Sequence, residues 1–212
     1  MTRAVVFSGG GDYVDPWHPF AETSTEIARL LREDGVEVDI VDQLGGLDPL
    51  LSAADLLILN AGGGGHPHPL DQRARHLIGG FEGGLLVVHV AATMFPADPV
   101  WEERLGGRWV RGTTMHPERG PLMLRAVGDN VLTRGIEKVE TVDEAYSWLR
   151  VSDHADVLYA HEYADASHAV VWLVDHGGPR TAYSALGHDV EAYEAPEVRD
   201  LLRRLARWAA SA

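Results

Sequence analysis

Histidine stands at or just after the end of several apolar runs in this sequence. His18 lies in the loop that follows the first run, His89 directly follows residues 85–88, and His188 follows residues 181–186. An imidazole can exchange a proton near neutral pH, and it can also bind a metal ion. Ligands of open parallel sheets bind beyond the carboxyl ends of the strands. We therefore expect these histidines to meet in one site if the runs are parallel strands.

A second candidate is the segment DEAY at residues 143–146, which follows another strand-like run. A carboxylate at a strand end can act as a base or as a metal ligand. We assign Glu144 as a candidate catalytic residue beside His89 and His188. Asp143 and Tyr146 are candidate substrate-binding residues. The alternative for this segment is an ordinary acidic turn in an acidic protein.

Together these residues supply a donor set that suits a divalent metal. Imidazole and carboxylate ligands without thiolate fit zinc, manganese or iron. The predicted ligands are His18, His89, Glu144 and His188. The same groups can also work as an acid/base pair without metal. The alternative is four unrelated polar residues, each capped locally, with His89 as a core histidine that bonds to backbone.

Other histidines carry less information. His66 and His68 alternate with prolines and fit a solvated loop. Four more have no positional argument and are predicted at the surface: His154, His161, His168 and His176.

Composition excludes several mechanisms and partners. The chain has no cysteine, so disulfides, thiolate metal sites and cysteine nucleophiles are excluded. Its 32 acidic and 18 basic residues give a formal net charge of -14, which disfavours nucleic acid and anionic membranes as partners. Neither glycine run matches a phosphate-binding motif, and no G-x-S-x-G elbow supports Ser8 as a nucleophile. Without an apolar leader or a long apolar span, we expect a cytoplasmic protein.

Strands and helices alternate in the first half of the chain and must position these side chains. The run at residues 54–60 is almost all apolar, as in a strand covered on both faces. Thr23 with Glu26 fits a capping box at the start of the first helix. The alternation predicts a parallel sheet with helices on both faces. The expected strands are 4–7, 36–41, 54–60 and 85–88, and the expected helical stripes are 23–31 and 70–81.

The second half contains strand-like runs with few helices between them, so we expect antiparallel or hairpin-like strands that extend the sheet. A final helix is predicted to begin near Pro196. No repeat or linker marks a boundary, which indicates a single domain over residues 1–212. The expected strands are 122–127, 139–142, 157–163, 169–174 and 181–186.

Taken in order, these segments resemble the trehalose-utilisation (ThuA-like) family. The resemblance implies a flavodoxin-like, class I glutamine-amidotransferase-like fold, doubly wound around a mostly parallel sheet. It also adds His116 and Asp189 to the candidate substrate-binding residues. The matching pieces are His18, residues 83–92 (GGLLVVHVAA), residues 105–107 (LGG), His116, residues 143–146, Trp172, residues 180–189 (RTAYSALGHD) and the last helix with Trp208.

The resemblance also bears on the chemistry. Amidotransferases of this fold carry a cysteine at the sharp turn where this chain has His89, so cysteine-dependent glutamine amidotransfer is excluded. The chain departs from the family pattern at residues 130–133 (NVLT) and 177–180 (GGPR).

The family is associated with trehalose and 3-keto-sugars. We therefore expect an enzyme of carbohydrate metabolism that acts on a small-molecule sugar or keto-sugar through acid/base or metal-assisted steps. Trp17 and Tyr146 offer aromatic faces for a pyranose ring. The alternative is a non-catalytic domain that binds a sugar or a protein partner. The sequence leaves open whether the chain forms a homo-oligomer.

Overall fold

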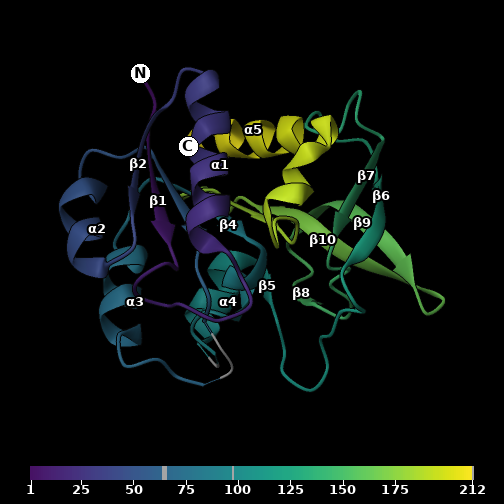
Figure 1. Ribbon diagram of the computed structural model, residues 1–212, viewed down its shortest axis with the longest axis horizontal. Helices are drawn as coiled ribbons and strands as arrows, with labels where there is room; N and C mark the ends of the chain where they lie inside the picture. Colours follow the sequence, from purple (N-terminus) through teal and green to yellow (C-terminus); the bar gives the residue numbers. More distant parts are fainter. Residues whose placement is uncertain (64–65, 97, 212) are drawn as a thin grey trace.

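Two strands at the centre of the sheet are buried at every position: β3 (Leu56–Asn60) and β4 (Gly84–Val88). Such strands must be covered on both faces. The computed structural model describes residues 1–63, 66–96 and 98–211, and in these ranges it has a nine-stranded sheet flanked by helices (Figure 1). The predicted α/β fold is thereby confirmed.

The first half of the chain builds the parallel part of the sheet. β1 (Arg3–Ser8) pairs in parallel with β2 (Glu37–Val41) on one side and with β3 on the other. β4 in turn pairs in parallel with β3 and with β11 (Thr181–Ser184). Because β1 lies between β2 and β3, the winding reverses there, which is where open α/β sheets bind their ligands.

The second half extends the sheet with antiparallel strands, as expected. From β11 the order continues through β10 (Ala166–Val174), β9 (Asp156–Tyr163), β6 (Gly120–Ala126) and β7 (Lys138–Asp143), each antiparallel to its neighbour. Each step reverses the strand direction, so β7 runs the same way as β11. The carboxyl end of β7 therefore faces the same edge as those of β4 and β11.

Two amphipathic helices pack together against the parallel half. α1 (Phe20–Glu33) and α5 (Pro196–Ala210) contact each other and β3, and in Figure 1 α1 crosses one end of α5. Arg207 of α5 donates to the Asp34 carboxylate beyond the end of α1 at 2.7 Å. The final helix predicted near Pro196 is α5, and its apolar face is buried against the core.

The remaining elements are short. α3 (Asp71–Gly79) matches the predicted stripe, whereas α2 (Leu44–Leu51) and α4 (Pro99–Leu105) are too short for a periodic signal and were not predicted. β5 (Gly107–Arg108) and β8 (Arg150–Val151) form a separate two-stranded ribbon. Two 3₁₀ turns follow strands, η1 (His89–Thr93) and η2 (Val190–Glu194). No helix among the described residues is long and apolar enough to cross a membrane.

The capping prediction for the first helix is wrong. α1 already begins at Phe20, and no side chain caps it. The Thr23 hydroxyl instead donates to the carbonyl of Pro19 at 3.2 Å and accepts from the buried Asn60 amide at 2.8 Å. Thr23 is thus taken up by contacts inside the first turn and with β3.

The surface placement predicted for four histidines holds for His154 and His176 only. His161 and His168 are 3% and 6% exposed. His161 Nε2 lies 2.9 Å from the carbonyl oxygen of Tyr146, and His168 Nδ1 accepts from the Trp148 amide at 3.1 Å. These β9 and β10 histidines are buried because the segment after β7 crosses over them, and they hold that segment in place.

Candidate metal centre

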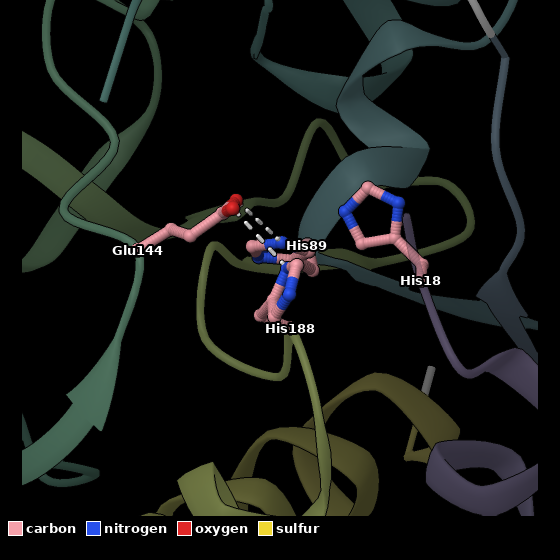
Figure 2. A group of neighbouring side chains, drawn as sticks. All are labelled: His18, His89, Glu144 and His188. Atoms are coloured by element: carbon pink, nitrogen blue, oxygen red, sulfur yellow. Dashed lines mark ion pairs between the residues drawn. The ribbon is translucent and has the colours of Figure 1, made fainter. Parts of the chain in front are cut away.

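Four side chains from separate elements meet at the carboxyl edge of the sheet (Figure 2). One potential ligand atom from each lies within 4.8 Å of those from the other three. They follow β1, β4, β7 and β11, so the convergence expected from the strand ends is present. We call this set the His/Glu cluster: His18, His89, Glu144 and His188.

His89 occupies a strained turn directly after β4. Its φ of 50° lies in the left-handed region that non-glycine residues rarely adopt. The buried Tyr183 hydroxyl donates to the His89 carbonyl at 3.1 Å and supports this turn. His89 Nδ1 lies 2.6 Å from the carbonyl oxygen of Ala185. Because a carbonyl only accepts, Nδ1 carries the proton of the neutral ring and Nε2 keeps its lone pair.

That lone pair faces two oxygens. The Tyr146 hydroxyl lies 3.0 Å from His89 Nε2, and Glu144 Oε2 lies 3.3 Å from it. The hydroxyl can donate to a neutral imidazole, but a carboxylate cannot. A lone pair opposite a carboxylate oxygen is favourable only when a proton or a cation lies between them.

The ring of His18 is oriented toward the cluster by Asp15, a residue that we did not single out in the sequence. Asp15 Oδ1 lies 2.8 Å from His18 Nδ1, and the same carboxylate accepts from the backbone amides of Trp17 and His18. His18 Nε2 is buried and has no hydrogen-bond partner among the described residues. Carboxylate–histidine pairs of this kind orient metal ligands in many proteins. An acid three positions before a histidine in a strand-end loop was the signal available for Asp15.

The charges around His18 keep its ring available as a ligand. Burial lowers the pKa of His18, and the neighbouring Asp15 carboxylate offsets this only partly. Burial alone would raise the pKa of Asp15, but the hydrogen bond and charge of His18, together with the backbone amides of Trp17 and His18, outweigh that effect and lower it. The histidine is therefore neutral and the aspartate ionised at neutral pH.

Glu144 is the charged member of the cluster and is joined to His89 and His188 in Figure 2. Its side chain is only 11% exposed. Burial alone would raise the pKa of Glu144, but His188 and His89, when they are protonated, outweigh it and hold that pKa well below its usual range. His188 Nδ1 lies 3.3 Å from Glu144 Oε1, and this contact raises the pKa of His188 against the effect of burial.

Asp143 holds the backbone that carries Glu144 and His188. It is 1% exposed and accepts from the backbone amides of Glu144 at 2.8 Å, Gly187 at 2.7 Å and His188 at 3.3 Å. Burial raises the pKa of Asp143. Its bonds join the end of β7 to the loop after β11, so they fix Glu144 relative to His188.

A pocket of about 520 Å³ opens above the cluster. His18, Glu144 and His188 line it, together with Trp17, Trp109, His116 and Tyr146. Three of the predicted substrate-binding residues, Trp17, His116 and Tyr146, thus lie in the pocket wall.

Two other predicted substrate-binding residues do not line the pocket. Asp143 is committed to backbone amides. Asp189 forms an ion pair with Arg119 at 2.8 Å and accepts from the Glu191 amide at 2.9 Å. Both carboxylates therefore hold the loops around the pocket in place.

The glycines after β3 serve close packing. A Cβ on Gly62 would lie 2.6 Å from an Asp15 carboxylate oxygen, and one on Gly63 would lie 2.4 Å from the Met94 backbone. The loop that carries Asp15 and the turn after β4 therefore approach this run closely. Gly64 and Gly65 lie outside the described residues.

Comparison with solved structures shows that the chain has a known fold. A ThuA-like protein from Parabacteroides merdae has a TM-score of 0.78 at 20% identity, over 99% of this chain and 90% of that one. A ThuA-like protein from Bacteroides uniformis has a TM-score of 0.72 at 15% identity, over 98% and 91%. A protein described as a GMP synthase subunit from Thermoplasma acidophilum has a TM-score of 0.62 at 17% identity, over 100% and 95%. At these identities the likeness establishes the fold alone.

No curated protein matches the sequence. The sequence does match the family described as ThuA, trehalose utilisation, over residues 3–209. Because this match covers nearly the whole chain, the protein belongs to the ThuA family.

Proposed function

We propose that this protein is an enzyme that acts on a sugar or 3-keto-sugar with the help of a divalent cation bound by the His/Glu cluster. The observation that carries the proposal is the state of the ligand atoms. Nδ1 of His18 and of His89 is already hydrogen-bonded, and their Nε2 atoms face a common centre with Glu144. Three imidazoles and one carboxylate suit zinc, manganese or iron.

The buried, unpartnered Nε2 of His18 is the specific sign that the cluster fits a cation. Buried polar atoms without a partner are rare, since each costs about 1–3 kcal/mol. His188 Nδ1 is also buried and makes no well-formed hydrogen bond, although Glu144 Oε1 lies 3.3 Å away. A bound cation would satisfy both atoms and would supply Lewis acidity toward a carbonyl or hydroxyl oxygen.

His116 is the pocket residue best placed to move a proton. Its Nδ1 lies 2.9 Å from the carbonyl of Pro117, so the neutral ring has its lone pair on Nε2. That Nε2 lies 3.5 Å from Glu144 Oε2, and the side chain is 33% exposed. A 3-keto-sugar has acidic C–H bonds beside its carbonyl. His116 is therefore placed to take such a proton, as elimination, hydration or isomerisation requires.

Aromatic side chains support a sugar as the substrate. Trp17 is 71% exposed at the pocket, and Trp109 packs edge-on against Tyr146 with ring centroids 4.7 Å apart. Flat aromatic faces next to polar groups are suited to a pyranose ring. The same exposed tryptophan favours the second candidate function, sugar binding without catalysis.

Metal binding is tested on the full chain. Elemental analysis after purification without chelator, and calorimetric titration with Zn²⁺ and Mn²⁺, should give about one tight site per chain. His188→Ala and Glu144→Gln should each weaken it by at least about tenfold. The matched control is the His154→Ala/His176→Ala double variant, which removes an exposed Glu103–His154–His176 group elsewhere on the chain. Unchanged affinity in His188→Ala would end the proposal of this site.

Catalysis is tested separately. A 3-keto-sugar incubated with the protein in D₂O should exchange deuterium at the carbon next to the carbonyl, observed by NMR, and His116→Ala should abolish the exchange. Sugar binding without exchange or turnover would favour the non-catalytic function.

A further inference from the structure

A second cavity of about 190 Å³ adjoins the pocket above the His/Glu cluster. The two share a wall that includes His18, Trp17 and Trp109. What distinguishes the second cavity is its basic lining, because Arg108 and Arg111 both contribute to it. In a chain of net charge -14, two guanidinium groups beside the pocket need an explanation.

Arg108 is poorly neutralised although it is mostly buried. Its side chain is 14% exposed, and its Nη1 lies 3.8 Å from Glu102 Oε2. That carboxylate is already taken by Arg150, which donates to its two oxygens at 2.6 and 2.8 Å. Within the described part of the chain, the Arg108 Nε donates only to the carbonyl of Trp109, at 3.3 Å. Its ion pair with Glu102 is thus long and shared with Arg150, and Arg108 also lines the cavity.

Arg111 lies in the loop after β5 and is exposed. Within residues 1–63, 66–96 and 98–211, no acidic side chain lies within 4.0 Å of its guanidinium nitrogens. Asp15 is the one carboxylate lining this cavity among those residues, and it is committed to His18 and to two backbone amides. Among the described residues, Asp15 forms an ion pair with His18 and none with either arginine.

We infer that the substrate carries an anionic group, a carboxylate or a phosphate, which binds between Arg108 and Arg111. This inference rests on the proposed function and specifies its substrate class as an acidic sugar. The sugar ring would extend past Trp109 toward the His/Glu cluster, because the two cavities share that wall.

Charge and geometry both favour an acidic over a neutral sugar. Guanidinium groups match carboxylate and phosphate oxygens through paired, charge-assisted hydrogen bonds. A neutral sugar needs no such charge. The acidic surface of the chain repels anions, so an anionic substrate needs local positive charge where it binds.

The experiment compares four probes by calorimetric titration of the full chain: glucose 6-phosphate, glucuronate, glucose and trehalose. The acidic sugars should bind at least about tenfold more tightly than the neutral ones, as expected for hydrogen bonds to charged groups. Higher salt should reduce the difference. Whether phosphate or carboxylate binds more tightly identifies the natural anion, and either order supports the inference.

Variants locate the anion. Arg111→Gln should remove most of the preference for acidic sugars and leave the affinity for glucose unchanged, and Arg108→Gln/Arg111→Gln should remove the rest. The matched control is Arg73→Gln, an exposed arginine of α3 outside both cavities, which should change nothing. Circular dichroism of each variant excludes unfolding.

A parallel titration of His188→Ala, with chelator present, separates this inference from the proposed cation site. If the preference for acidic sugars survives there, the arginine subsite stands whether or not a cation binds. If the preference is lost in His188→Ala but kept in Arg111→Gln, the anion binds at the cluster and the inference is wrong. Equal affinity for all four probes, or no binding of the acidic sugars at millimolar concentration, also overturns it.

Discussion

The Tyr146 hydroxyl and His89 Nε2 lie 3.0 Å apart, and their stacked rings have centroids 4.5 Å apart. His89 Nδ1 is committed to the Ala185 carbonyl, so Nε2 is the one nitrogen of the neutral ring that can accept a proton or bind a cation. A hydrogen bond from Tyr146 and a cation would therefore compete for the same lone pair.

This competition predicts an unusual result for Tyr146→Phe. The variant removes the hydroxyl and keeps the ring that stacks on His89. Because the hydrogen bond that opposes the cation is worth about 1 kcal/mol, cation affinity should stay the same or rise by up to about fivefold. Titration with Zn²⁺ or Mn²⁺ measures it, and His89→Ala should lose affinity in the same assay. A loss in Tyr146→Phe as large as in His89→Ala would contradict the assignment of Nε2 as a ligand.

Asp15→Asn tests the residue that orients His18. The asparagine keeps the size of the side chain but removes the charge that holds the Nδ1 proton of His18 in place. Cation affinity should fall by about 10–100-fold, as is usual when such a supporting carboxylate is removed. Asp12→Asn is the control in the same loop. Of the hydrogen bonds between described residues, the Asp12 side chain accepts only the one from the Leu44 amide, and an asparagine can also accept there. Equal affinities in the two variants would show that Asp15 does not support a ligand.

The parallel half of the fold was predictable because its strands are continuous apolar runs. Residues 54–60 and 85–88 have the pattern of strands covered on both faces, and the side chains after parallel strands share one edge. This is why His18, His89 and His188 were expected together. Glu144 was expected from its place at a strand end, and the structure brings it to the same edge because β7 runs in the same direction as β11 after an even number of reversals.

What the sequence did not reveal depends on contacts between distant segments. Nothing local to His161 and His168 shows that residues 146–148 will cover them. Asp143 was expected to bind substrate, yet its oxygens accept hydrogen bonds from backbone amides of a loop more than forty residues away. No sequence motif marked Arg108 and Arg111 as binding residues. Their proposed role depends on a cavity that several separate loops form.

Gly84→Ala should be one of the most damaging small substitutions in the chain. A Cβ there would lie 2.0 Å from the carbonyl oxygen of Ala209 in α5, and backbone cannot move aside easily. Overpacking of this kind costs about 1–3 kcal/mol or more. Urea denaturation should show that loss. Gly79→Ala is the control at the end of α3, where no atom of the described residues lies within 4 Å of the added Cβ. It should be neutral or stabilise the protein by up to about 1 kcal/mol, and a similar loss in both variants would refute the packing argument.

Asp98 should make the stability of the chain depend on pH. Its carboxylate caps α4 by accepting from the Val100 and Trp101 amides at 3.0 and 3.3 Å, and it lies 3.2 Å from Arg75. Burial alone would raise the pKa of Asp98, but the bonds from Arg75 and the two amides outweigh it and lower it. A carboxyl whose pKa falls on folding stabilises the protein fully above its unfolded pKa of about 3.9. That contribution disappears as the pH falls through the lower folded value.

Two substitutions separate the cap from the charge. Asp98→Ala should lose about 1 kcal/mol at pH 7, because alanine cannot cap. Asp98→Asn keeps an oxygen for the amides but loses the charge, so it should lose less at pH 7. Urea denaturation from pH 7 to pH 3 should show the difference between wild type and Asp98→Asn shrinking below about pH 4, since protonated Asp98 no longer attracts Arg75. A difference that stays constant over this range would mean that the charge of Asp98 does not contribute to stability.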